Sequence, residues 1–141
     1  MIELLQLNDQ TSSLLVNAEV FDNAVDPSQL ARFVADAGHI LVFARDGKRV
    51  LGFASGTVLL HPDKEPAFFV NEVDVLPERQ REGIGKALCK QLIELAREKG
   101  CTSVWLATEA DNTPARALYR SLKGRETDEV VVYEWPVKES D

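Results

Sequence analysis

The chain has 141 residues, of which 45% are apolar and 28% are charged, so its composition is that of one small globular domain. The formal net charge of −7 argues against nucleic acid or an anionic membrane as the main partner. No apolar stretch is long enough to cross a bilayer, the N-terminal residues do not resemble a signal peptide, and the only cysteines are Cys89 and Cys101. We therefore expect a cytoplasmic protein with buried thiols.

The first half of the chain is predicted to form two helices and a hairpin around a short first strand. Strands are expected over Ile2–Leu7, His39–Arg45 and Lys48–Leu60, the last two joined by an Asp-Gly turn. Apolar residues at helical spacing predict a helix over Asp9–Phe21. A second helix follows Asp26, where an Asp-Pro pair is typical of an N-cap and first helical residue, and it ends at Gly38.

The second half alternates strands and helices. A strand over Ala67–Leu76 leads into an amphipathic helix that ends near Lys99, followed by a strand over Thr102–Thr108 and a helix over Thr113–Leu122. A last antiparallel pair is expected over Lys123–Glu126 and Glu129–Val137, and Trp105 and Trp135 are expected in the core. The order β-α-α-β-β-β-α-β-α-β-β predicts an α/β (α+β) protein with a mixed sheet, in one domain over residues 1–141.

The most informative segment is the glycine-rich turn between the strand and the long helix. Gly83-Ile84-Gly85 opens that helix, where unpaired N–H groups and the positive end of the helix dipole favour a phosphate or pyrophosphate. The spacing fits neither a P-loop nor a dinucleotide fingerprint, since Ala87 follows Lys86 and a third glycine is missing. The alternative is that the two glycines only ease a tight turn.

The residues around this turn carry a resemblance to a known family. Gln80-Arg81-Glu82-Gly83-Ile84-Gly85, directly after a strand and a proline, resembles the pyrophosphate loop of GCN5-related N-acetyltransferases (GNAT), and Asn112 to Tyr119 resembles a second family segment. Within the family, the chain looks most like the gentamicin-type aminoglycoside 3-N-acetyltransferases. The resemblance implies a mostly antiparallel sheet that splays between its fourth and fifth strands. One departure is Gly124, which lies one position off the family pattern after Tyr119.

The resemblance implies acetyl-coenzyme A as the cofactor and implies how the chain holds it. Backbone groups of the splayed strand would pair with the pantetheine arm, the glycine loop would hold the pyrophosphate, and the start of the last helix would complete the site. The residues implied in cofactor binding are Val73, Asp74, Val75, Gln80, Arg81, Glu82, Gly83, Ile84, Gly85, Lys86, Asn112, Ala115 and Tyr119. On a purely structural interpretation, Asn112 caps the last helix, and both roles are compatible.

Acetyl transfer to an amine needs a base for the ammonium and an acid for the departing thiolate. Glu72 matches the family position of the general base, with Asp74 in reserve, and Tyr119 matches the general acid. A phenol with an ordinary pKa near ~10 is protonated at pH 7 and can donate its proton. The plain alternatives are a carboxylate that points to solvent and a core tyrosine on an amphipathic helix.

A polycationic acceptor would need several carboxylates. The candidates for acceptor binding lie along the splayed strand and in neighbouring loops: Asp22, Asp26, Glu72, Glu109, Asp111, Asp128 and Glu129. The alternative is that some of these acids are ordinary loop and cap residues. No metal site is expected, because His39 and His61 stand apart from each other and from the cysteines.

Three functions follow from these patterns. The first is an acetyl-coenzyme A-dependent N-acetyltransferase that acts on a small polycationic amine, most specifically the 3-amino group of an aminoglycoside, and so confers antibiotic resistance. The second is a GNAT acetyltransferase of a protein N-terminus, a lysine or another small amine. The third is a non-catalytic acyl-coenzyme A-binding module. A homodimer is considered as the assembly.

Overall fold

The computed structural model describes residues 1–138. The chain divides into two compact units, residues 1–107 and residues from Thr108 onward. The first unit holds the sheet and the long helix, and the second holds one further helix and the C-terminal segment.

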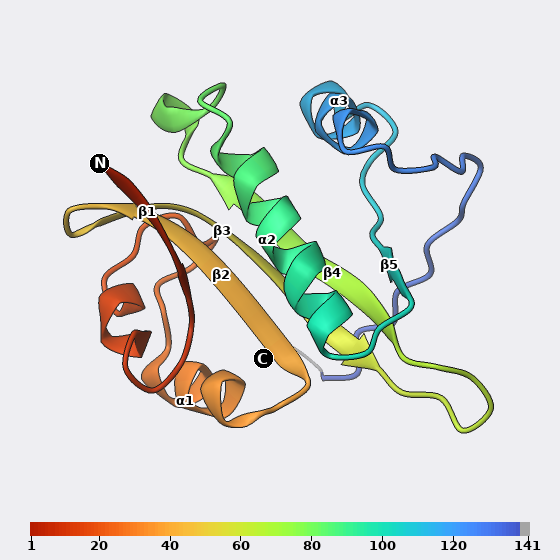
Figure 1. Cartoon of the computed structure of the whole chain (residues 1–141), viewed down its shortest axis with the longest axis horizontal. Coiled ribbons are helices and arrows are strands. Elements are labelled where there is room, and N and C mark those ends of the chain that lie inside the picture. The colour runs from red at the N-terminus through yellow and green to blue at the C-terminus, as the bar shows by residue number, and fades with distance from the viewer. Residues whose placement is uncertain (139–141) are drawn as a thin grey trace. The chain divides into compact units, whose positions relative to one another are not determined.

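The first unit is built on a five-stranded mixed sheet in the order β1-β2-β3-β4-β5 (Figure 1). Its first three pairings are antiparallel and the pairing of β4 with β5 is parallel. The strands are β1 (Ile2–Gln6), β2 (His39–Asp46), β3 (Arg49–Leu59), β4 (Ala67–Val75) and β5 (Ser103–Trp105). The helical elements of this unit are the 3₁₀ turn η1 (Ser12–Leu15), the helix α1 (Pro27–Ala35), the 3₁₀ turn η2 (Pro77–Arg79) and the helix α2 (Ile84–Glu98).

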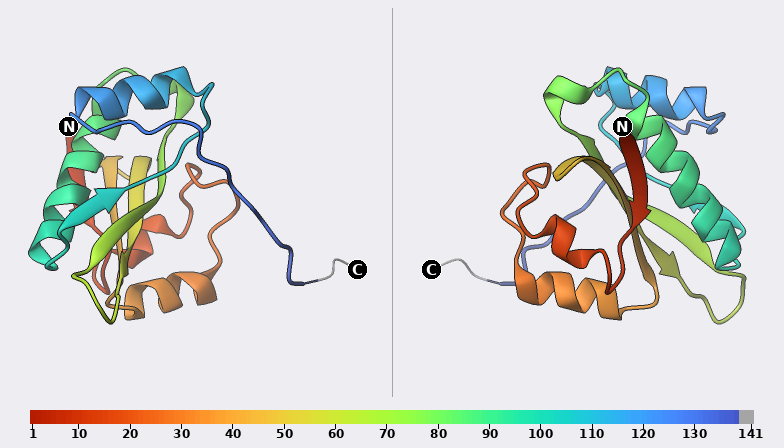
Figure 2. Two further views of the ribbon diagram at one scale, coloured as in Figure 1. Left: turned by 90° about the vertical axis from the view of Figure 1, so that its right-hand side faces the viewer. Right: turned by 60° about the vertical axis from the view of Figure 1, so that its left-hand side comes forward.

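Helix α2 covers one face of the sheet, and η1 and α1 lie over the other (Figure 2). The apolar stripe of α2 is buried against the sheet through Leu88, Leu92 and Ala96. Phe68 is fully buried on the same side of the sheet as α2, and Phe43 and Phe53 are fully buried on the other side. The close fit at β3 requires a glycine, because a Cβ on Gly56 would overlap the Phe68 ring. The core therefore fixes β3 and β4, the strands that position the candidate site.

Two features of β4 open it toward a ligand. A β-bulge at Asn71 shifts the pairing of β4 with β3, since Ser55 pairs with Glu72 whereas the next residue, Gly56, pairs with Val70. On its other side β4 pairs with β5 over only three residues, Ala67 to Phe69. Beyond Phe69, β4 runs on to Val75 without β5 beside it. The expected splay between the fourth and fifth strands is thus present.

The predicted helix over residues 9–21 was wrong, since only η1 forms there. Polar side chains take over the backbone hydrogen bonds at its start. Asn8 Oδ1 accepts from the N–H of Gln10 at 2.8 Å and of Thr11 at 3.1 Å, while Thr11 Oγ1 donates to Gln6 O at 2.8 Å. Such local bonds compete with helix formation. The other predicted helices and strands up to residue 122 are present, with ends shifted by a few residues.

The predicted last strand pair was also wrong, because residues 123–138 form no strand. Lys123 has φ 68° at the end of helix α3 (Thr113–Ser121), and Glu129 has φ 61°. The Glu126 carboxylate is held by Arg116 at 3.0 Å and by Arg120 at 2.7 Å, which draws the segment back along its own helix. These bonds hold the segment to α3, and no strand pairing forms in residues 123–138.

The two tryptophans are not in the core as predicted. Trp105 is 52% exposed and Trp135 is 75% exposed. Trp105 lies on the short edge strand β5, and Trp135 lies in the segment that forms no strand, so neither is covered by a packed neighbour on both sides. By contrast, Phe68 is fully buried, and Phe21 and Phe33 pack against the core while partly exposed. None of the described helices has the length and apolar character needed to span a membrane.

Candidate active site

The glycine loop is shaped to receive an anion. Arg81 has φ 67° and Gly83, the N-cap of α2, has φ 81°, so two left-handed residues precede the helix. Within residues 1–138, no acceptor takes the backbone N–H groups of residues 81–86. A Cβ built on Gly83 meets open space. Consecutive free N–H groups at the start of a 15-residue helix form an anion-binding concavity.

The side chains of the loop are arranged so that its backbone stays accessible. The Arg79 guanidinium pairs with Glu82 at 2.8 Å, which lowers the pKa of the Glu82 carboxyl and leaves only the Glu82 backbone free for a ligand. Gln80 Nε2 donates to Val75 O at 3.3 Å and so ties the loop to the end of β4. Arg81 and Lys86 form no ion pair with any described residue, so their charges remain available for a phosphate.

The bulge in β4 gathers polar side chains on the sheet face opposite α2. Before the bulge, Phe68 and Val70 face α2, and after it Val73 and Val75 do so. Glu72 and Asp74 therefore share the other face. Asn71 joins them there, because its Nδ2 donates to Thr57 Oγ1 at 3.0 Å. Valines and acids thus alternate between the two faces of this strand after the bulge.

Asp22 is brought to the same face by an aromatic contact. The Phe21 ring lies 4.3 Å from the Phe53 ring, measured between centroids, and Phe53 is the cross-strand partner of Asp74. This contact holds the loop after η1 over the sheet and places Asp22 near both β4 carboxylates. Of the acids predicted to bind an acceptor, Asp22 and Glu72 are thus gathered, together with Asp74.

Crowding of these carboxylates changes their acidity. Burial raises the pKa of Glu72, and the negative charges of Asp22 and Asp74 raise it further. Burial also raises the pKa of Asp74, against a hydrogen bond from the Val75 N–H at 3.0 Å, and the charge of Asp22 adds to the rise. A carboxylate with a raised pKa is a stronger base and is stabilised by a cation, so this face suits an organic ammonium.

Two of the remaining predicted acids, Asp26 and Asp128, have local roles in the structure. Asp26 is the N-cap of α1 and accepts from the N–H of Ser28 at 2.8 Å and of Gln29 at 3.2 Å. Asp128 lies near Arg116 and raises the pKa of that guanidinium, after the larger effect of Glu126. Glu109, Asp111 and Glu129 are exposed residues of the second unit.

In the second unit, Asn112 begins the helix that carries Tyr119. Asn112 Oδ1 accepts from the Ala115 N–H at 3.2 Å, which confirms the capping role predicted from the sequence. Tyr119 is half-buried on α3. The residue after the C-cap of α3 is Lys123 with φ 68°, and the Gly124 N–H donates to Tyr119 O at 3.1 Å. Lysine thus occupies the left-handed position usually taken by glycine, which explains the shifted glycine of the sequence pattern.

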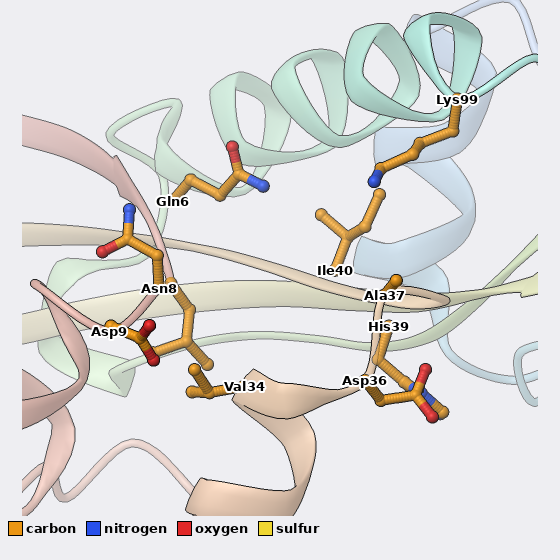
Figure 3. A pocket seen from close by; sticks show the side chains of 10 residues that line it. Gln6, Asn8, Asp9, Val34, Asp36, Ala37, His39, Ile40 and Lys99 are labelled. Carbon is orange, nitrogen blue, oxygen red and sulfur yellow. The ribbon is translucent and has the colours of Figure 1, made fainter.

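A separate polar hollow lies at the far end of α2 (Figure 3). It is lined by residues of β1, α1, β2 and the end of α2, including Asp36, His39 and Lys99. His39 Nδ1 lies 3.0 Å from Asp36 Oδ1, and this imidazole together with the Gly38 N–H lowers the pKa of Asp36. The hollow contains no residue of the glycine loop or of β4, so it is not the site described above. No cluster of metal-ligating side chains occurs in residues 1–138.

Comparison with known proteins identifies the family. Residues 3–124, most of the chain, match the Acetyltransferase (GNAT) family. The chain belongs to this family. Curated relatives include a mycothiol acetyltransferase of Pseudarthrobacter chlorophenolicus, 37% identical over 93% of this chain and 43% of that protein. A [Ribosomal protein bS18]-alanine N-acetyltransferase of Escherichia coli is 34% identical over 56% of this chain and 57% of that protein. The chain thus spans less than two thirds of either relative.

Solved structures share the fold at lower sequence identity. An aminoglycoside acetyltransferase from an uncultured soil metagenomic sample, solved with trehalose, superposes with a TM-score of 0.84 at 20% identity over 97% of both chains. An aminoglycoside antibiotic 6′-N-acetyltransferase of Acinetobacter baumannii superposes with a TM-score of 0.74 at 18% identity, over 98% of this chain and all of that one. The predicted GNAT fold is confirmed.

GNAT acetyltransferases use acetyl-coenzyme A, and the residues of this chain fit that group. The free N–H groups of the glycine loop match a pyrophosphate, and the open space at Gly83 lets the backbone approach it. The part of β4 beyond Phe69 offers a strand edge for the amides of a pantetheine arm. The acyl donor predicted from the sequence is therefore that of the family.

Sequence reasoning missed two polar residues next to Glu72. Ser55, the cross-strand partner of Glu72, is 5% exposed, and Asn71 forms the bulge. The polar doublet Asn71-Glu72 interrupts the apolar alternation of the strand, and this was the available signal for the bulge. Ser55 gave no signal, because a serine in an apolar strand does not reveal what lies across from it.

Proposed function

We propose that this chain transfers the acetyl group of acetyl-coenzyme A to an amine of a small polycationic acceptor, most specifically the 3-amino group of an aminoglycoside. The observation that carries the proposal is the group of carboxylates Asp22, Glu72 and Asp74 on the β4 face that leads into the glycine loop. Glu72 and Asp74 have raised pKa values, and with the nearby Asp22 they form a group of carboxylates that several ammonium groups would stabilise.

Glu72 is the general base of this proposal. Its raised pKa brings it closer to that of the ammonium from which it removes a proton, directly or through water. Asp74, on the same face, is the reserve base and adds negative charge that favours the cationic acceptor over a neutral one. Asp22, in the loop after η1, is the third carboxylate of the group. The burial of Ser55 supports a fixed position for Glu72 across the β3–β4 pairing.

Tyr119 is the proposed general acid, and Asn112 and Ala115 at the start of α3 are proposed to contact the cofactor. The phenol would donate its proton to the departing thiolate, so the proposal requires α3 to reach the thioester. The acids of the second unit and the α1 cap Asp26 remain proposed acceptor contacts, with Asp26 already engaged by two N–H groups. The backbone from Gln80 to Lys86 would hold the pyrophosphate.

Two relatives support different acceptors. The names mycothiol acetyltransferase and bS18-alanine N-acetyltransferase favour, respectively, another small molecule and a protein N-terminus. The fold shared with aminoglycoside acetyltransferases, one of them named for the 6′ nitrogen, favours the antibiotic without selecting its 3-amino group. A non-catalytic acyl-coenzyme A-binding module is disfavoured by the presence of both Glu72 and Tyr119. A cytoplasmic location and a homodimeric assembly complete the proposal.

An acceptor screen tests the proposal. The purified chain is mixed with acetyl-coenzyme A and with gentamicin, sisomicin, an alanine-terminated peptide or a monoamine, and released thiol is detected. Burial raises the pKa of Cys89 to about 11, so that thiol of the chain adds little background. We expect aminoglycosides to give the highest kcat/KM, with a KM that rises with ionic strength. Better turnover of a monocationic acceptor would sink the aminoglycoside assignment, and mass and NMR analysis of the product would identify the acetylated nitrogen.

A further inference from the structure

An exposed aromatic pair stands on the sheet beside the acidic residues of β4. Trp105 of β5 and Phe69 of β4 are direct partners in the parallel pairing, and their ring centroids lie 4.5 Å apart at an angle of 45°. Phe69 is half-buried and supports the indole, whereas Trp105 keeps 52% of its surface exposed. The indole is therefore supported on one side by Phe69 and open to a ligand elsewhere.

The aromatic pair and the acids share one face of the sheet. Phe68, on the opposite face from Phe69, overlaps the position that a Cβ on Gly56 would take and is fully buried on the α2 side. The bulge at Asn71 then reverses the alternation, so that Glu72 and Asp74 project to the same side as Phe69. Without the bulge, Glu72 would face α2 instead. The change of register thus places Glu72 and Asp74 on the surface that carries the indole, and the contact of Phe21 with Phe53 brings Asp22 to the same surface.

The spacing along β4 sets the size of a molecule that could contact both Trp105 and Glu72. Glu72 lies three positions after Phe69, and a strand rises ~3.3 Å per residue, so the indole and the Glu72 carboxylate lie on the order of 10 Å apart. A compact amine cannot bridge this gap. A molecule with a second cationic group about 10 Å from the reacting nitrogen can.

We propose that Trp105 binds a second cationic group of the acceptor through a cation–π contact, so that the acceptor is an extended organic dication or polycation. This inference rests on the proposed function and adds to it the minimal acceptor. Tryptophan is the aromatic side chain that attracts cations most strongly, and the nearby carboxylates raise the local concentration of such molecules. The reacting ammonium would lie at Glu72 while the second cation lies on the indole.

The test uses two amines that differ only in the second charge. Binding of 1,8-diaminooctane and of octylamine to the chain saturated with coenzyme A is measured by calorimetry, for the wild type, Trp105→Leu and the control Trp135→Leu. We expect Trp105→Leu to weaken diamine binding about tenfold and to change octylamine binding less than twofold. Trp135→Leu, which replaces the exposed tryptophan of the C-terminal segment, should change neither.

Each result decides the inference. An equal loss for both amines would show an apolar contact and overturn it, as would unchanged diamine binding in Trp105→Leu. A thermal melt of Trp105→Leu that matches the wild type establishes that the fold is intact. Because binding is measured without turnover, this result is separate from the acceptor screen. A chain that binds the diamine through Trp105 but acetylates no amine would refute the proposed function alone.

Discussion

Helices α2 and α3 are alike in sequence and differ in what they bury. Both follow a loop that ends in a capping residue, and both carry an apolar stripe at helical spacing. Helix α2 buries five residues, from Ile84 to Ala96, whereas α3 buries none. Periodicity therefore identified two amphipathic helices, but only the packing shows which one belongs to a core. The proposed pyrophosphate loop thus precedes a helix with a buried stripe, whereas the proposed general acid lies on a helix with none.

Their C-terminal ends make the same turn with different residues. In α2 the Gly100 N–H donates to Arg97 O at 3.0 Å and the Cys101 N–H to Ala96 O at 3.1 Å. In α3 the equivalent bonds join Lys123 to Arg120 at 3.0 Å and Gly124 to Tyr119 at 3.1 Å. The left-handed residue is Gly100 in the first case and Lys123 in the second. This is the Schellman motif, built once with the favoured residue and once without it.

The largest expected effect is on the free energy of unfolding, and it is tested by truncating one leucine in each helix. Leu92→Ala in α2 removes a fully buried side chain and should lower the free energy of unfolding by about 2–5 kcal/mol. Leu118→Ala in α3 removes a half-buried one and should cost about 1 kcal/mol or less. Denaturant unfolding measures both. Equal losses would mean that α3 is packed as tightly as α2.

The next prediction compares the proposed base and acid. Glu72→Gln and Tyr119→Phe should each lower kcat by about a hundredfold with little change in coenzyme A affinity, because each removes a proton transfer. The deficit of Glu72→Gln should be greatest at low pH, where the ammonium is hardest to deprotonate. Steady-state rates across pH check this, and wild-type rates in both variants would refute the catalytic roles.

Two glycines allow a matched test of the pyrophosphate loop. Gly83 and Gly100 flank α2, both have positive φ, and a Cβ at either meets open space. Valine at either position should strain the backbone to a similar degree. Only Gly83→Val should lower the affinity for coenzyme A, by about tenfold, because its side chain would enter the space in front of the free N–H groups. Calorimetry on both folded variants measures this, and a similar loss in Gly100→Val would indicate a general effect of strain.

Exchanging the residues of the two Schellman turns should give effects of opposite sign. Lys123→Gly removes a left-handed residue with a Cβ and should stabilise α3 by about 1 kcal/mol. Gly100→Lys should destabilise α2 by a similar amount. Hydrogen exchange of the last turn of each helix is the sensitive measurement, and a loss of protection in Lys123→Gly would contradict the observed turn.

The smallest expected effects concern Asp74, a carboxylate with a raised pKa, and Glu126, one with a lowered pKa. The pKa of Asp74 is raised, so its ionised form destabilises the fold at neutral pH and the cost disappears as the pH falls through the raised value. Asp74→Asn should therefore raise the melting temperature by about 1–2 °C at pH 7 and by less at acidic pH. The pKa of Glu126 is lowered to about 2 by Arg116 and Arg120, so its stabilising effect is present above the unfolded value near ~4.3.

Glu126→Gln should thus reduce protection of α3 at pH 7, and the difference from the wild type should vanish as the pH falls toward 2. Hydrogen exchange followed over this range provides the check for Glu126, and thermal melts provide it for Asp74. A melting temperature that falls in Asp74→Asn at neutral pH would contradict the crowding of carboxylates on β4.

Much of the fold could be predicted because local patterns and core packing agreed. The hairpin turn at Asp46-Gly47 and the Asp26 cap of α1 are short-range devices that do not depend on distant residues. The predicted helix over residues 9–21 failed where Asn8 and Thr11 captured the backbone at its start. The predicted last strands failed because a strand needs a partner, and apolar composition alone does not supply one.

The sequence by itself determined the family, the glycine loop and the acids of β4, since these depend on residue types at fixed spacing along one element. Only the tertiary structure decided which acids meet, because Asp22 reaches Glu72 through the contact of Phe21 with Phe53 across the chain. It also decided that Trp105 is exposed beside those acids. Both results depend on which faces of the sheet are covered and on the bulge, which reverses the face to which the following residues of β4 point. Neither the coverage of a face nor its reversal is set by one residue alone.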